Sequence, residues 1–303
     1  MDRNVRLSDL DIWILIVLYK LPWAMDYHVA LLVGEPVKYV RRRLQQLAEG
    51  GLVRRVNLMA NRTALNAITS KGISEAGLEP RNVCNPTYFS VEHDLGVIDT
   101  VVYLSILEKN GKHLTDFGSI ITERDFQSVR EMEQVGTRSD GKPIYKAKDD
   151  GIHEPDAYII KKDKYIAVEF ERTLKSRKSN SQLIDNAIDL RKRFDKQYWI
   201  YGNNAVRNKL NEVRKDIPEM SIIGIDDVRE YLRIRLERLP ETISAKTGIP
   251  TNNRIGTMQD PIPLNKLPLR NGLSLERAKD VKTGVAHQHA RADYPLRTRL
   301  SLE

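Results

Sequence analysis

The sequence contains a single cysteine and has no long hydrophobic run. Cys84 alone excludes an internal disulfide and a cysteine-based zinc cluster, and this fits a reducing compartment. The most apolar stretch, residues 12–23, is interrupted by Lys20 and Pro22 and is too short to cross a bilayer. It also lacks the basic start and small-residue cleavage site of a signal peptide. These absences predict a cytoplasmic protein without a membrane partner.

Positive charge, in contrast, is present in excess. The 303 residues include 49 Lys and Arg against 41 Asp and Glu, which gives a formal net charge of +8. Basic surfaces attract polyanions such as nucleic acid. The charge therefore favours a nucleic-acid partner, although it also fits a protein that is merely basic. The length is enough for two ordinary domains.

Residues 1–80 are expected to form helices followed by a two-stranded wing. Ser8 is placed to cap a helix over residues 9–20, and a second helix is expected over residues 26–33. Pro36 suits the first turn of a third helix, and Gly50-Gly51 suits its end. The apolar stripe of this third helix has spacings of three and four and consists of Val37, Val40, Leu44 and Leu47. Strands are predicted over 52–56 and 63–68.

This order resembles the winged helix-turn-helix of bacterial regulators. The resemblance implies a domain over residues 1–80 whose third helix enters the major groove of double-stranded DNA, with the wing on the phosphates. A basic face that is only solvated, or a wing that contacts protein, is the alternative. The candidate DNA contacts are basic residues of the third helix and the wing: Lys38, Arg41, Arg42, Arg43, Arg54, Arg55 and Arg62.

Residues 81–239 are expected to form a second α+β domain. Residues 81–90 have the composition of a linker, and residues 136–151 are predicted to be a loop because they are polar and contain Gly and Pro. Between residues 154 and 226, a predicted hairpin is followed by alternating helices and strands, which indicates a mixed sheet with flanking helices. Residues 240–303 lack periodicity and are predicted to be a basic tail, extended or disordered, that folds on DNA or on a partner protein.

Three carboxylates fall on the predicted hairpin. Asp156 opens its first strand, and Glu169 and Glu171 lie two residues apart on the second, so they share a face. Carboxylates crowded together repel one another unless a cation lies among them, and hard ions such as Mg²⁺ or Mn²⁺ prefer oxygen ligands. This pattern predicts a divalent metal site, although alternating charge on a solvated hairpin is the plainer interpretation.

Pro155-Asp156 and Glu169 resemble the motif of the PD-(D/E)xK nuclease superfamily. The resemblance implies a restriction-endonuclease-like sheet and metal-dependent cleavage of DNA. The motif lysine is absent, because Glu171 occupies its position. Arg172 and Lys175 are the local candidates to replace it. Glu92 or Glu123 is expected to supply a further acidic group.

A narrower resemblance covers about residues 8–230. The runs His93-Asp94-Leu95, Pro155-Asp156-Ala157 and Glu169-Phe170-Glu171-Arg172-Thr173 are similar to those of the replication-relaxation family, which includes MobC-type plasmid mobilisation relaxases. The resemblance implies an endonuclease that nicks one strand at an origin of transfer, with Asp156, Glu169 and Glu171 on the metal. Accessory mobilisation or coupling proteins would then bind the tail.

Three questions stay open from the sequence. His93 is a candidate to contact a phosphate or orient Asp156, but a histidine at the start of a helix is also commonly structural. A nuclease that cuts both strands is one alternative function. A non-catalytic replication or transfer regulator with a degenerate nuclease fold is the other, and the missing lysine is its main support.

Overall fold

The computed structural model has a mixed α+β fold. All of the residues that it describes belong to one compact unit. The described residues are 7–57, 64–81, 91–109, 112–113, 115, 117–123, 125, 132–137, 143–147, 153–161, 164–173 and 177–239. The predicted tail over residues 240–303 and nearly all of the predicted linker therefore lie outside them. No described helix has the length and apolarity needed to span a membrane.

The N-terminal part begins with helices and a small antiparallel sheet of strand order β1-β3-β2. Its elements are α1 (Asp9–Lys20), β1 (Ala24–Met25), α2 (Asp26–Val33), α3 (Val37–Glu49), β2 (Val53–Val56), β3 (Leu65–Ile68) and α4 (Ser70–Glu75). The predicted bounds of α1 and α2 are confirmed. Ser8 caps α1, with its hydroxyl accepting from the Asp11 amide. Val40, Leu44 and Leu47 of α3 are buried, as their spacing predicts.

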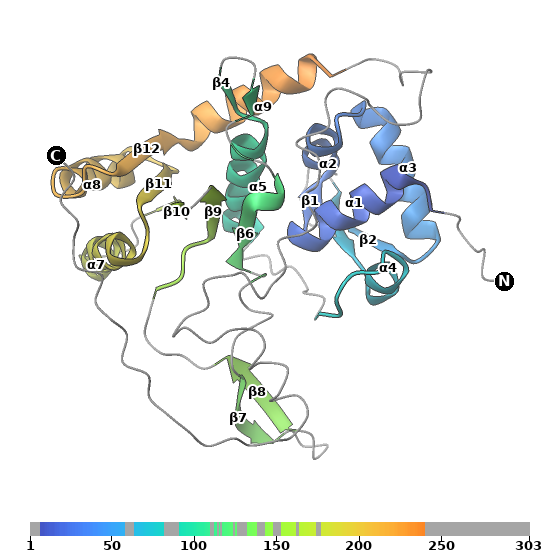
Figure 1. Ribbon diagram of the computed structural model, residues 1–303, viewed down its shortest axis with the longest axis horizontal. Helices are drawn as coiled ribbons and strands as arrows, with labels where there is room; N and C mark the ends of the chain where they lie inside the picture. Colours follow the sequence, from blue (N-terminus) through green and yellow to red (C-terminus); the bar gives the residue numbers. More distant parts are fainter. Residues whose placement is uncertain are drawn as a thin grey trace. The chain divides into compact units, whose positions relative to one another are not determined.

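The second part is built around a five-stranded mixed sheet of order β12-β11-β10-β9-β6 (Figure 1). Strands β10, β11 and β12 are parallel, and β9 is antiparallel to both of its neighbours. The strands are β6 (Ile120–Thr122), β9 (Ala157–Lys161), β10 (Lys164–Glu171), β11 (Lys196–Tyr201) and β12 (Met220–Gly224). The helices are α5 (Val91–Ile106), α7 (Arg177–Arg193), α8 (Asn204–Arg214) and α9 (Ile225–Glu237), with a 3₁₀ turn, η1 (Phe117–Ser119), and a short hairpin, β4 (Glu108–Lys109) and β5 (Lys112–His113).

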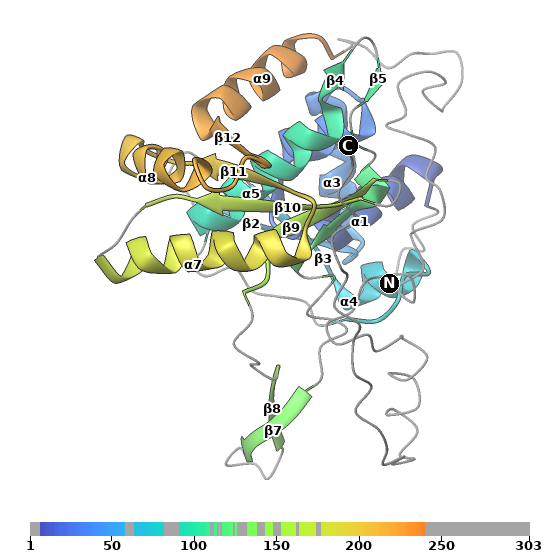
Figure 2. The same ribbon diagram turned by 60° about the vertical axis from the view of Figure 1, so that its left-hand side comes forward.

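Helices cover both faces of this sheet because neighbouring strand residues point to opposite sides. Val168 belongs to the core on the side of α5 and α9, whereas Ala167 belongs to a separate core with Leu183 of α7 and Leu210 of α8. Figure 2 shows the sheet nearly edge-on, with α7 on the side opposite to α5 and α9. The sequence therefore predicts the mixed sheet and its flanking helices correctly.

The prediction of a loop over residues 136–151 is wrong in part. Strands β7 (Met132–Thr137) and β8 (Pro143–Ala147) form an antiparallel pair there. Gly136 lies at an irregularity of the pairing, and Pro143 is the first residue of its strand. Both are positions at which strands tolerate Gly and Pro, so the residues that suggested a loop are compatible with a hairpin.

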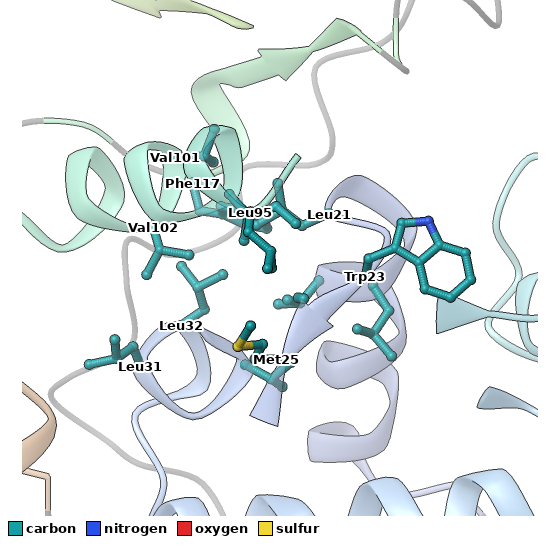
Figure 3. Packing of buried hydrophobic residues seen from close by; sticks show 14 of the residues in the cluster. Leu21, Trp23, Met25, Leu31, Leu32, Leu95, Val101, Val102 and Phe117 are labelled. Carbon is teal, nitrogen blue, oxygen red and sulfur yellow. The ribbon is translucent and has the colours of Figure 1, made fainter. Parts of the chain in front are cut away.

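The two parts share one hydrophobic core. Leu95 and Val102 of α5 pack in the same cluster as Met25 and Leu32 of the N-terminal part (Figure 3). A polar contact accompanies this packing, because the Nζ atom of Lys20 donates to the carbonyl oxygen of Ile120 at 2.6 Å. The N-terminal part is thus held against α5 and β6 by side-chain contacts in addition to its covalent connection along the chain.

Candidate active site

The β9–β10 hairpin places Asp156 next to the end of β10 that carries Glu169. Ala157 pairs with Val168, so Asp156, one residue earlier, lies beside the next residues of β10. Its Oδ2 atom accepts a hydrogen bond from the backbone N–H of Phe170 at 2.7 Å. The structure therefore brings together the two acidic residues that match the "PD" and "(D/E)" positions.

Both carboxyls are in an environment that opposes their ionisation. Burial, followed by the negative charge of Glu169, raises the pKa of Asp156 to about 8. Burial also raises the pKa of Glu169 well above its ordinary value, and the charges of Glu171 and Glu123 add to the effect. Such a pair binds either a proton or a cation at neutral pH.

Glu171 and Glu123 extend this acidic cluster. Glu171 lies on the same face of β10 as Glu169, as predicted from their spacing. Glu123 follows β6, and its backbone N–H donates to the carbonyl oxygen of Asp156 at 3.0 Å. Of the two candidates for a further acidic group, Glu123 is therefore the one whose charge acts on both Asp156 and Glu169.

Glu92 and Arg172 bind each other. The Arg172 guanidinium forms an ion pair with the Glu92 carboxylate of α5, and both side chains are largely exposed. The ion pair therefore occupies the Glu92 carboxylate and holds the Arg172 guanidinium next to α5. Lys175, the other candidate for the missing lysine, lies outside the described residues.

Two histidines flank the carboxyl pair. The Nε2 atom of His153 lies 2.6 Å from Oε1 of Glu169, and the Nε2 atom of His93 lies 3.8 Å from Oδ1 of Asp156. The His93 ring also packs edge-on against Phe170, with ring centroids 5.5 Å apart. Burial lowers the pKa of His153, which favours the neutral imidazole at pH 7.

His153 and its support were not singled out in the sequence. Arg193, at the end of α7, donates to the carbonyl oxygen of His153 and binds the carboxylates of Glu154 and Asp189 at 3.5 and 3.0 Å. The only available signal was that His153 lies three residues before Asp156. The role of Arg193 could not be read from the sequence, because α7 is brought to this site by the tertiary fold.

The donor chemistry of the cluster fits a hard divalent cation. Within the described part of the chain, no three His, Cys, Asp or Glu side chains converge as a preformed metal site. Mg²⁺, however, is commonly held by one or two carboxylates and keeps several of its waters. Asp156 and Glu169 supply such a pair, and a cation would offset the burial and the neighbouring negative charges that raise their pKa values.

The predicted DNA contacts divide into two groups. Lys38, Arg41 and Arg42 are exposed on α3, where Arg41 also contacts Asp26 at 2.9 Å. The remaining described residues point inward: Arg43 binds the buried Asp11, Arg55 binds Asp26, and Arg54 lies over the Trp23 ring. Arg62 lies outside the described residues. Among the described candidates for DNA contact, the exposed cations are therefore on α3.

Comparisons with known protein families, with curated proteins and with solved structures give no match to this chain.

Proposed function

We propose that this chain is a divalent metal-dependent DNA endonuclease. The observation that carries the proposal is the juxtaposition of Asp156 and Glu169, two acidic side chains held side by side against the cost of burial. Their hydrogen bonds to Phe170 and His153 fix the carboxyls in place. Asp156 directly precedes β9 and Glu169 lies on the adjacent strand β10, an arrangement that is compatible with the PD-(D/E)xK resemblance.

The N-terminal elements support DNA as the substrate. The order α1-β1-α2-α3-β2-β3, with the sheet order β1-β3-β2, is compatible with the winged helix that the sequence resemblance implies. In such domains the helix equivalent to α3 enters the major groove. Here α3 carries Lys38, Arg41 and Arg42 on its exposed side, which suits contacts to phosphates.

The site residues would divide the work in the following way. When bound, Mg²⁺ or Mn²⁺ supplies activation of a water and neutralises charge on the scissile phosphate. Asp156 and Glu169 would hold this cation, with Glu171 and Glu123 adding negative charge around it. His93 lies at the more exposed edge, where its side chain is 44% accessible, and would contact the phosphate or orient Asp156. Nicking of one strand at an origin of transfer follows from the family resemblance.

The direct test is incubation with supercoiled plasmid carrying the origin of the cognate mobile element, with Mn²⁺ or with EDTA. We expect nicked circles only with metal, and none with Glu169→Gln. The matched control is Glu219→Gln, which makes the same change at an exposed position of the same sheet region. Linear DNA that forms only with metal would indicate that the protein cuts both strands and is not a nickase. Intact supercoils would overturn the enzymatic proposal.

A non-catalytic DNA-binding regulator is the second candidate. It is favoured by the ion pair between Arg172 and Glu92, because this contact occupies the described candidate for the missing lysine. In that case the protein would shift origin DNA in a gel and leave it uncut at every metal concentration.

A further inference from the structure

We propose that His153 is an imidazole ligand of the divalent cation, and that cation binding draws His153, Asp156 and Glu169 together into a set of donors that is not preformed among the described residues. The inference rests on the proposed function, since it concerns the same metal site. It adds a nitrogen donor to a site that the sequence motif describes by carboxylates alone. The PD-(D/E)xK motif assigns no metal ligand to the position of His153.

The first argument is the position of the ring. The His153 Nε2 atom and the Glu169 Oε1 atom lie 2.6 Å apart, with a proton between them. Two donor atoms held this close can bind one cation in place of that proton, because divalent ions bind neutral imidazole and ionised carboxylate. The side chains are 29% and 9% accessible, so the pair is shielded but open to an ion.

The second argument is that His153 and Asp156 come from one short segment. Pro155 lies between them and restricts the backbone of the segment and of Glu154 before it. His153 reaches Glu169 from this segment, and Asp156 reaches the Phe170 amide of the same strand. A single short segment therefore carries a nitrogen donor at Glu169 and an oxygen donor at the next residue of β10, Phe170.

The third argument is the anchoring of His153 by α7. The Arg193 guanidinium binds the His153 carbonyl oxygen, and the carboxylates of Asp189 and Glu154 hold Arg193 in turn. Supporting contacts of this kind fix the orientation of metal ligands in proteins. A histidine that only donated a hydrogen bond to Glu169 would need no such support for its backbone.

A nitrogen donor has a consequence for metal preference. Carboxylate sites suit Mg²⁺, whereas imidazole favours transition metals. The wild-type protein should therefore bind Mn²⁺ more tightly than Mg²⁺, and the difference should shrink with His153→Gln. Glutamine keeps an N–H donor for Glu169, so it preserves the hydrogen bond while removing the imidazole.

The test is electron spin-echo spectroscopy of Mn²⁺ bound to the full-length protein. Coordination by His153 predicts ¹⁴N couplings typical of imidazole, which are lost in His153→Gln and kept in His113→Gln, a change on β5 outside the candidate site. The Mn²⁺ dissociation constant of His153→Gln, measured by titration, should rise by about tenfold or more. Circular dichroism checks that the variant is folded. If it is not, labelling the wild type with ¹⁵N-histidine should replace the ¹⁴N signal.

The outcomes separate the inference from the proposed function. Wild-type protein that lacks imidazole couplings or does not bind Mn²⁺, or couplings that persist in His153→Gln, would overturn the ligand role. Metal-dependent nicking without those couplings would leave the nuclease standing and remove His153 from the metal. Couplings without nicking would support the ligand role and overturn the nuclease.

Discussion

The Nε2 atom of His28 on α2 lies 2.7 Å from Oδ1 of Asp99 on α5. The Met25 amide donates to Nδ1 of the same ring at 3.0 Å, so Nε2 carries the proton and donates to Asp99. The hydroxyl of Tyr27 and the Nε atom of Arg229 also donate to this carboxylate, each at 2.9 Å. Asp99 thus joins the N-terminal part to the mixed-sheet part through two side chains, His28 and Tyr27, while Arg229 of α9 binds it from within the mixed-sheet part.

Replacing Asp99 by asparagine should destabilise the protein by about 3 kcal/mol, because removing one partner of a buried charged network leaves the others uncompensated. The measurement is the free energy of unfolding in urea. Asp216→Asn, at an exposed position, is the matched control and should change stability by less than about 0.5 kcal/mol. Equal midpoints for Asp99→Asn and wild type would show that the contact is not stabilising.

The Asp99 carboxylate should also make the stability of the protein depend on pH. Burial would raise the pKa of Asp99, but the hydrogen bond from His28 and the hydrogen bond and positive charge of Arg229 outweigh it and lower the pKa. A lowered pKa in the folded state stabilises the protein above the unfolded value and is lost as the pH falls through the folded value. The stability gap between wild type and Asp99→Asn should therefore narrow below about pH 4. A gap that widens in acid would contradict this sign.

Asp156→Asn should have the opposite pH profile. The pKa of Asp156 is raised to about 8 in the folded protein. The folded state therefore loses stability as the pH rises from the pKa that Asp156 has in the unfolded chain to the pKa that it has in the folded protein. The variant should be more stable than metal-free wild type by about 1–3 kcal/mol near pH 8, and the gain should be smaller near pH 5. Melting temperatures in EDTA measure this. Asp185→Asn, on the exposed side of α7, should show no such trend.

Gly96 on α5 provides a steric test of how the site is supported. A Cβ atom at this position would overlap the ring of Phe170, whose amide binds Asp156. Gly96→Ala should therefore destabilise the protein by about 1–3 kcal/mol and weaken Mn²⁺ binding. Phe170→Leu in the same chain should recover part of the loss, which a double-mutant cycle would measure. Additive effects would argue against the contact.

Arg42 and Arg43 should separate DNA binding from folding. Arg42 is exposed on α3, so Arg42→Ala should weaken DNA binding, lower the salt dependence by about one unit of slope and leave stability nearly unchanged. Arg43 binds the buried Asp11, so Arg43→Ala should cost about 3 kcal/mol of folding free energy. Loss of stability with Arg42→Ala and not with Arg43→Ala would reverse this assignment.

Local patterns predicted most of the secondary structure. The apolar spacing of Val40, Leu44 and Leu47 and the capping by Ser8 were sufficient, because they act within one element. The same reasoning failed for β7 and β8, where Gly136 and Pro143 suggested a loop. These two segments are strands because they pair with each other. The propensities of individual residues contain no information about such a partner.

The candidate site was predictable only where its residues lie on one hairpin. Asp156, Glu169 and Glu171 follow from strand alternation and a turn. The roles of His153 and Arg193 do not, and neither does the choice of Glu123 over Glu92, because β6, β9, β10 and α7 bring these residues together from separate segments. The ion pair between Arg172 and Glu92 likewise depends on how α5 packs across the sheet.

The sequence by itself determined the helices, the strands of the mixed sheet and the acidic hairpin, because these depend on periodicity and on contacts close along the chain. The tertiary structure decided the partners of each charged group. It turned Arg43 and Arg55 inward, left Lys38, Arg41 and Arg42 at the surface, and placed His153 on Glu169. Burial and the distances between charges set these interactions, and both quantities exist only once the chain has packed.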